Sequence, residues 1–200
     1  MVKEPEYVGI VLDAQAIKVL AHPLRSRLLS RLRTLGAATA TELAAELNTN
    51  TGATSYHLRK LESVGLVTDT GEGEGKRRLW KASTQYHSWT NAAFRDDEDT
   101  ATALGWLQRD YVHQFAERYD HWLDAAPSWP AEWVDVLGLN DTFVVVTPEQ
   151  MASLQQRLDD LLTEFRTVGA GDDRARKVSV YCYARPSDHT PPEDSEGETA

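Results

Sequence analysis

Apolar residues recur every three or four positions in the first third of the chain, the spacing that buries one face of a helix. The clearest stripe, over residues 23–35, consists of leucines: Leu24, Leu28, Leu32 and Leu35. Pro23 suits the first turn of this helix, because the N–H that proline lacks would have no partner there, and Gly36 ends it. Asp13 predicts the cap of a shorter helix before it, which runs to about Leu20.

The next stretch, residues 39–82, predicts two more helices and a hairpin. Thr39 and Glu42 have the spacing of a capping box, in which each side chain accepts from the other residue's backbone N–H. The elements follow in this order: a helix over 40–47, a turn over 48–50, a helix over 51–64, and two strands over 66–68 and 78–82 around a glycine-rich tip. This order is typical of a winged helix-turn-helix, in which the second helix enters a DNA groove and the hairpin contacts the backbone.

Helix 51–64 has two distinct faces. On a helical wheel, Leu58 and Leu61 lie on the side that faces the preceding helices. The opposite side carries small, hydroxyl-bearing and cationic side chains, which suit base edges and phosphates. The predicted DNA-binding residues are Thr51, Gly52, Ser55, Tyr56, Arg59, Lys60 and Ser63 on the helix, with Lys76, Arg77 and Arg78 on the hairpin. For His57 we favour a packing or hydrogen-bonding role over base readout, and we interpret His22 as a helix-start residue.

The second half predicts a long helix over residues 100–125. Its apolar stripe consists of Leu104, Leu107, Tyr111, Phe115, Tyr119 and Trp122. Burying each such side chain contributes roughly 1.5–3 kcal/mol, so a monomer is not expected to leave all six exposed. We expect this stripe to form the dimerisation surface of a homodimer; packing on the chain's own winged domain is the alternative.

After the long helix, the pattern predicts a small α/β unit. Short apolar strands are expected over 142–146 and 178–183, around a helix over 148–165 that opens with a second capping box. These strands are too few to form a sheet alone, so we expect them to pair across a dimer or with another segment. The fold class is therefore mainly α with a small β component. It divides into a winged helix-turn-helix domain at 1–90, a linker and long helix at 91–128, the α/β unit at 129–185 and a disordered acidic tail at 186–200.

The net charge of −10 argues against a nucleic-acid partner until its distribution is considered. Residues 1–90 hold 12 Lys and Arg against 9 Asp and Glu, a net of +3, whereas residues 91–200 hold 9 against 22, a net of −13. Local positive patches bind phosphate, so the first half is expected to face double-stranded DNA. No apolar run approaches the roughly 20 residues that span a bilayer, and no signal-peptide pattern opens the chain. We therefore expect a cytoplasmic protein without a membrane partner.

Four stretches resemble the winged helix-turn-helix of ArsR-type bacterial transcriptional regulators. They read LAHPLRSRLL, ATELAAELN, SYHLRKLESVGLV and KRRLWKAS, and the similarity covers about residues 12–83. The resemblance implies a homodimeric repressor that binds a pseudo-palindromic operator and is released by an effector, here an unidentified small molecule. It places the recognition helix at residues 51–63.

Many members of that family bind metals, but the residues here do not favour a metal site. Where the family has Cys-X-Cys, this chain reads Glu42-Leu43-Ala44-Ala45-Glu46, and a single cysteine excludes Cys–Cys zinc motifs. The long helix carries four candidate ligands on one face: Asp110, His113, Glu117 and His121. The two histidines lie about 12 Å apart along the axis, so one ion cannot join both without a partner chain. We expect no metal and no cofactor.

The remaining aromatic residues and the cysteine are interpreted as structural. Trp129, Trp133, Tyr181 and Tyr183 are expected in a core, with an apolar ligand pocket as the alternative. For Cys182 a buried thiol is favoured over a redox switch. The predicted function is that of a sequence-specific DNA-binding transcriptional regulator; the alternative is a winged-helix protein-interaction module without DNA binding. We expect no enzyme, because the sequence has no glycine-rich phosphate loop and no nucleophile elbow.

Overall fold

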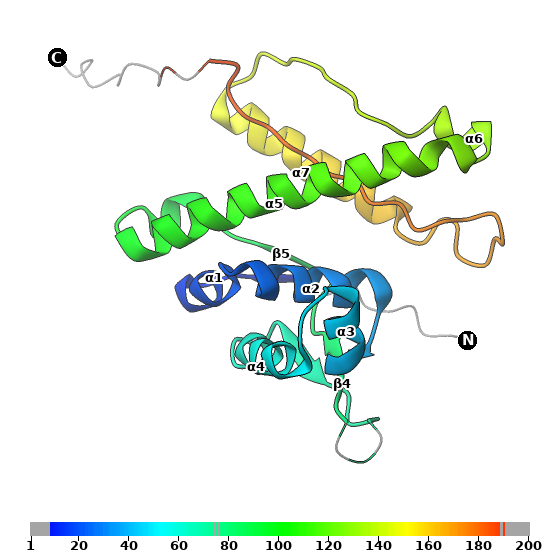
Figure 1. Cartoon of the computed structure of the whole chain (residues 1–200). Helices are drawn as coiled ribbons and strands as arrows, with labels where there is room; N and C mark the ends of the chain where they lie inside the picture. Colours follow the sequence, from blue (N-terminus) through cyan, green and yellow to red (C-terminus); the bar gives the residue numbers. More distant parts are fainter. Residues whose placement is uncertain (1–8, 74, 76, 189, 191–200) are drawn as a thin grey trace. The chain divides into compact units, whose positions relative to one another are not determined.

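The computed structural model describes residues 9–73, 75, 77–188 and 190 of the 200-residue chain. Lys76 and most of the predicted acidic tail therefore lie outside the described residues. The chain forms two compact units, Met1–Gly138 and Leu139–Ala200. Figure 1 labels the helices of both. None of the helices among the described residues combines the length and the apolar character that crossing a membrane requires.

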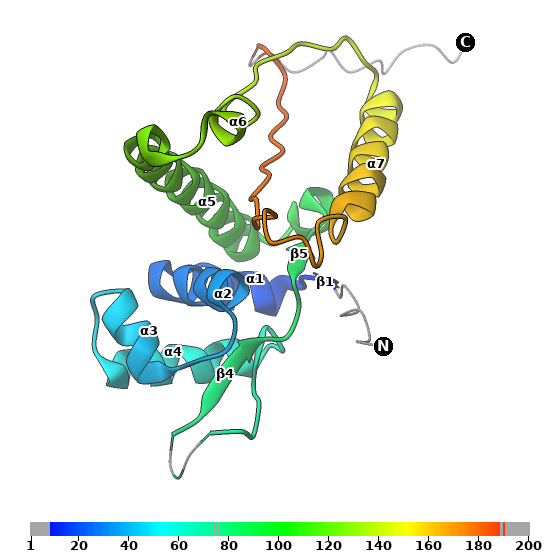
Figure 2. The same ribbon diagram turned by 90° about the vertical axis from the view of Figure 1, so that its right-hand side faces the viewer.

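The first unit contains all the strands that are assigned in the described chain. Its elements are β1 (Gly9–Val11), α1 (Ala14–Leu20), α2 (Pro23–Leu35), β2 (Ala38–Thr39), α3 (Ala40–Glu46), α4 (Thr51–Glu62), β3 (Val67–Asp69), β4 (Leu79–Ala82), β5 (Tyr86–Ser88), η1 (Asn91–Phe94), α5 (Glu98–Ala125), η2 (Ala126–Ser128) and α6 (Ala131–Val134). Strand order β2-β4-β3 gives an antiparallel sheet, in which β3 and β4 are the predicted hairpin. The hairpin projects away from the helices in both ribbon views (Figures 1 and 2).

Side-chain caps set where the helices begin, as the sequence predicts. Asp13 accepts from the backbone N–H of Ala16 at 2.8 Å, at the start of α1. At the start of α3, Thr39 and Glu42 form the predicted capping box. Asn50 caps α4 through its side-chain oxygen. Because these contacts span only three residues, the sequence carries the whole signal.

Three strands were not predicted. β1 pairs in parallel with β5, and β2 adds to the free edge of β4. Each is only two or three residues long. Segments this short show no readable alternation of apolar and polar positions, and their partners are distant in the sequence.

One core joins the winged helix-turn-helix to the long helix α5. Its buried members are Leu12, Ala16, Ile17, Leu20, Leu28, Leu29, Leu32, Leu43, Leu58, Leu61, Leu66, Val67, Trp80, Leu104 and Leu107. Leu104 and Leu107 come from α5 and are 5% and 0% exposed. The first part of the predicted dimerisation stripe therefore packs on its own domain, the alternative left open by the sequence. Leu104 and Leu107 thus have almost no surface left for a partner chain.

Polar contacts also attach α5 to α2. The Ser26 hydroxyl donates to the Asp110 carboxylate at 2.6 Å, and the Gln114 amide donates to the same carboxylate at 2.6 Å. One turn later, Arg27 pairs with Glu117 at 3.2 Å. The predicted domain boundary at residue 90 thus differs from the compact unit, which extends to residue 138. The reason is that α5 completes the core instead of standing apart from it.

The C-terminal part of the stripe is less covered than the N-terminal part. Phe115, Tyr119 and Trp122 are half-buried. The Phe115 and Tyr119 rings lie 6.0 Å apart, and Trp122 meets Trp129 edge to face at 5.5 Å. None of the three belongs to the buried core cluster of the described residues.

In its described part, the second unit consists of α7 (Pro148–Phe165) together with turns and segments that have no assigned helix or strand. Its helix begins with the predicted capping box of Thr147 and Gln150. The strands predicted over 142–146 and 178–183 are wrong: no strand is assigned in the described part of this unit. A strand needs a hydrogen-bonded neighbour, and two short segments alone make a marginal sheet at best.

The side chains of the second unit are also more exposed than expected. No described residue of this unit is buried; Cys182 is exposed, which corrects the prediction of a buried thiol. Tyr181 and Tyr183 are 47% and 74% exposed, so the expected core around them is absent from the described residues. The apolar content of this segment therefore does not produce a packed core within one copy.

Candidate nucleic-acid interface

Helix α4 is held against α2 and α3 by its apolar side. Leu58 and Leu61 are fully buried, and so is Thr54, whose hydroxyl donates to the Asn50 carbonyl at 3.1 Å. The turn before α4 contains Asn48 with a φ of +50°, a left-handed conformation that asparagine tolerates better than most residues. This tight turn sets α4 across α3 in the helix-turn-helix arrangement and fixes which face points outward.

The outward face of α4 has the composition that the sequence predicts. Six of the seven predicted helix residues are exposed: Thr51, Gly52, Tyr56, Arg59, Lys60 and Ser63. Ser55 is half-buried. The Tyr56 side chain is 54% exposed, and the Lys60 ammonium lies over its ring at 5.7 Å. Large polar and aromatic groups therefore project where a groove-binding helix needs them.

Two arginines next to each other in the hairpin differ in their surroundings. Arg77 is exposed. Arg78 is braced from two sides: its Nε lies 3.4 Å from the Asp69 carboxylate, and its Nη1 lies 3.9 Å from Glu62. Its guanidinium also lies over the Trp80 ring at 5.7 Å. The sequence did not predict these partners, which neutralise part of the Arg78 charge and tie the hairpin to α4.

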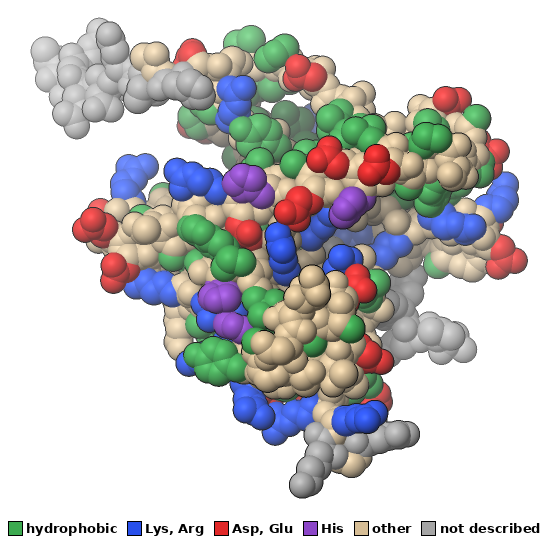
Figure 3. Space-filling view, viewed as in Figure 1, with side chains coloured by type: hydrophobic (Ala, Val, Ile, Leu, Met, Phe, Trp, Pro, Cys, Tyr) green, Lys and Arg blue, Asp and Glu red, His purple; other side chains and the backbone are tan. Residues whose placement is uncertain are grey.

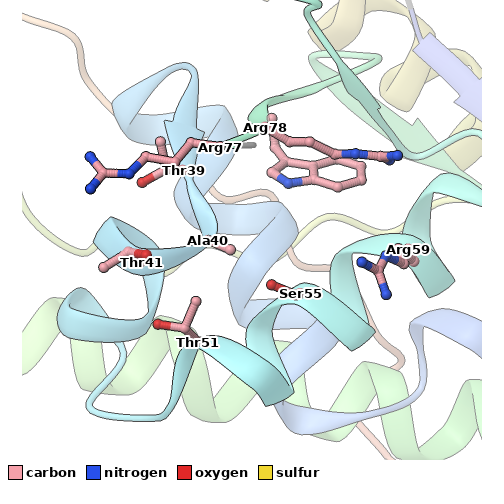
Figure 4. A pocket seen from close by; sticks show the side chains of 9 residues that line it. Thr39, Ala40, Thr41, Thr51, Ser55, Arg59, Arg77 and Arg78 are labelled. Carbon is pink, nitrogen blue, oxygen red and sulfur yellow. The ribbon is translucent and has the colours of Figure 1, made fainter. Parts of the chain in front are cut away.

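A hollow of about 180 Å³ lies between the start of α3, the helix α4 and the hairpin. Figure 4 shows that Ser55 and Arg59 approach it from α4, while Arg77 and Arg78 approach from the hairpin. Its lining residues are Thr39, Ala40, Thr41, Thr51, Ser55, Arg59, Arg77, Arg78 and Trp80. Hydroxyl groups and guanidinium groups on one concave surface provide donors for phosphate or base-edge oxygens.

A pair of histidines lies on the other flank of α4. The ring of His22, the residue that caps α2, lies 4.4 Å from the ring of His57 on α4, and Tyr56 meets His57 edge to face at 5.1 Å. His22 accepts from the backbone N–H of Leu24 at 3.1 Å, which confirms its interpretation as a helix-start residue. Figure 3 shows two adjacent histidine side chains on this surface, close to basic groups.

Burial keeps both histidines in their neutral form near pH 7. It lowers the pKa of His22, and the nearby charge of Arg25 lowers it further. It also lowers the pKa of His57, with further contributions from His22 and Arg25. Two buried atoms in this group make no hydrogen bond: Nδ1 of His57 and Nε of Arg25.

A third group, which the sequence did not predict, joins α2, β5 and α5. Arg33 Nη1 lies 2.6 Å from His87 Nδ1, so this arginine donates and the imidazole proton sits on Nε2. That nitrogen lies 2.8 Å from the Tyr111 hydroxyl. Burial, followed by the charge of Arg33, lowers the pKa of His87 to about 3. Burial also raises the pKa of the Tyr111 hydroxyl far above its usual value. Tyr111 is therefore bound within its own domain.

The candidate metal ligands on α5 are engaged elsewhere or exposed. Asp110 faces α2 and Glu117 pairs with Arg27, whereas His113 and His121 are exposed. Across the described ranges of the chain, no three His, Cys, Asp or Glu side chains are grouped for a metal ion.

Comparison with known proteins gives one match to a domain family. Residues 20–70 match the model of a helix-turn-helix domain. This segment is a helix-turn-helix domain. The match covers α2, α3, α4 and the start of the hairpin, and so includes the whole outward face described above. Together, the match and the winged fold support DNA-binding transcriptional regulation in general.

Two further comparisons add little. No curated protein matches this chain. Among solved structures, the chain is similar to one described as "Structure of Lactococcus lactis ZitR, C30AH42A mutant in apo form". The identity is 13%, with 73% of this chain and 84% of that chain covered, and the TM-score is 0.31. At that score the likeness carries no weight for fold or function.

Proposed function

We propose that this protein is a sequence-specific, homodimeric transcriptional repressor that inserts α4 into the major groove of its operator. The observation that carries the proposal is the outward face of α4, where Tyr56, Arg59 and Lys60 are exposed and Arg59 lies beside the cationic hairpin. In this mode of binding, small residues at the start of the helix allow close approach to the bases. Gly52 supplies the smallest such surface.

The cations have different roles in this proposal. Arg59 reads base edges, because it is exposed on the outward side of α4, in the last turn of the helix. Arg77 binds backbone phosphate from the hairpin, where it contributes affinity without sequence preference. Arg78 acts mainly as a brace, since Asp69 and Glu62 already surround its guanidinium.

In this proposal the dimer interface is formed by the C-terminal part of α5. A helix-turn-helix gains specificity from two half-sites about 34 Å apart, which requires two copies. Phe115, Tyr119 and Trp122 remain half-buried in one copy, so their apolar surface is available to a second. Release from the operator by a small-molecule effector is part of the proposal through the family resemblance.

Selection from a random duplex library tests the proposal directly. The wild-type protein should enrich a pseudo-palindromic site, and Arg59→Ala should bind that site weakly with relaxed base preference. Arg109→Ala is the matched control, because Arg109 is exposed on α5 outside the interface. Equal affinity of wild type and Arg59→Ala would contradict the interface. Absence of any DNA retention at about 100 mM salt, together with a stable protein complex, would favour an interaction module instead.

A further inference from the structure

We propose that His22, Arg25 and His57 form a second phosphate-binding site, on the flank of α4 opposite the hairpin. The inference rests on the proposed DNA-binding function and deepens it. Its ligand is a backbone phosphate of the operator. None of these three residues was predicted from the sequence to contact DNA.

The three side chains come together from two elements. His22 and Arg25 lie one turn apart at the start of α2, and His57 lies on α4 with its ring 4.4 Å from that of His22. His22 already accepts a hydrogen bond at Nδ1, so its proton sits on Nε2 and is available for donation. The site thus has a guanidinium and at least one oriented imidazole N–H.

The charge balance indicates that the missing partner is an external anion. Other arginines of α2 have partners within the fold: Arg27 pairs with Glu117, and Arg31 pairs with Glu46. Arg25 has no carboxylate partner among the described residues, although the chain as a whole is acidic. Its Nε is buried without a hydrogen bond, which leaves the outer guanidinium nitrogens as donors. A phosphate on this surface would satisfy them.

Because the two histidines are neutral, they can lie beside the Arg25 guanidinium without charge repulsion. The lowered pKa values of His22 and His57 leave Arg25 as the one full charge of the cluster near pH 7. Neutral imidazoles donate hydrogen bonds without repelling the neighbouring guanidinium.

The geometry of the major groove explains why there should be two phosphate sites. The groove is about 12 Å wide, and a helix with its side chains is about 10–12 Å across, so α4 would fill it from one backbone to the other. On α4, Ser55 and Arg59 face the hairpin, whereas His57 faces the start of α2. Arg77 would reach one phosphate backbone, and the cluster would reach the other.

Phosphate-replacement interference on the selected operator tests this inference. Single neutral methylphosphonate linkages are placed along both strands, and affinity is measured for each duplex. In wild type, two separate groups of phosphates per half-site should each reduce affinity about tenfold when replaced. In Arg25→Gln, one group should lose its effect while the group contacted by the hairpin keeps it.

Matched variants sharpen the result. Arg25→Gln should weaken operator binding about tenfold and reduce the salt slope by about 0.9, the value for one phosphate. Arg27→Gln, on the same helix but paired with Glu117, should bind like wild type. Thermal unfolding checks that both variants fold; if Arg25→Gln does not, the wild-type interference pattern decides alone. A single group of phosphates in wild type, on the hairpin side, would overturn the second site, whereas failure to select any operator would overturn the proposed function itself.

Discussion

At the level of single residues, neighbouring arginines in this fold have different surroundings and hence different expected effects. Arg77 is exposed, whereas Arg78 is held by Asp69 and Glu62 and lies over Trp80. The sequence places both in one basic run. Only the folded hairpin distinguishes a cation available to DNA from one already paired.

Replacing Arg77 and Arg78 separately should show this difference. Arg77→Ala should weaken binding to all DNA sequences alike and lower the salt slope by about 0.9. Arg78→Ala should lose less charge-dependent affinity and instead destabilise the domain by up to about 1 kcal/mol, the range for exposed ion pairs. Salt titrations and urea unfolding separate the two effects. Identical salt slopes for the two variants would argue against the bracing role.

The buried imidazole of His87 makes stability depend on pH. Its pKa is about 3 in the folded protein, against 6.5 as the ordinary value. Well above pH 6.5 the group is neutral in both the folded and the unfolded state and has no effect on stability. As the pH falls from 6.5 toward 3, the unfolded chain binds a proton that the folded chain excludes, so stability falls by up to about 1.4 kcal/mol per pH unit.

Urea unfolding between pH 7.5 and 5 measures this dependence. His87→Gln should flatten the loss of stability below pH 6.5, although the variant will be less stable overall because it disrupts the contacts with Arg33 and Tyr111. His113→Gln, at an exposed position of α5, serves as the control and should keep the wild-type dependence. An unchanged slope in His87→Gln would show that other groups cause it.

At the level of elements, the long helix α5 belongs to the winged domain. Leu107 is fully buried, and Asp110 and Gln114 bond to Ser26 on α2. A helix tied in this way is part of the same packed core as the winged domain.

Shortening a single buried side chain of α5 measures how much its packing on the winged domain contributes to stability. Leu107→Ala should cost about 2–5 kcal/mol of unfolding free energy, because it removes buried methyl groups and leaves a cavity. Leu123→Ala, on the same helix but 53% exposed, should cost less than about 0.5 kcal/mol. Urea unfolding followed by circular dichroism gives both values. Similar small losses for the two variants would place α5 outside the cooperative core.

For the whole molecule, the proposed homodimer makes the sharpest prediction. The wild-type protein should sediment at about 45 kDa, twice the chain mass of 22.4 kDa. Trp122→Glu should shift it to the monomer, since a charge in an apolar interface is costly. His113→Glu, on the other side of α5, should stay dimeric. A wild-type monomer at micromolar concentration would contradict dimerisation through this surface.

The second unit shows where prediction from sequence reached its limit. Its capped helix α7 was predicted, because the capping box spans four residues. Its strands were predicted from apolar runs alone, yet a strand also requires a hydrogen-bonded neighbour. An apolar run indicates that a segment has apolar surface to bury, but it does not indicate which other segment will cover that surface.

Local patterns in the chain were enough to establish the winged helix-turn-helix: its caps, the leucine stripe and the polar outward side of α4 each depend on residues within a turn or two of one another. The fold alone settled the partners of Arg78, the burial of Leu104 and Leu107, and the meeting of His22 with His57. These contacts join distant parts of the chain, such as Ser26 and Asp110, which are 84 positions apart. Periodicity fixes which side of an element is apolar, whereas only packing selects the surface that covers it.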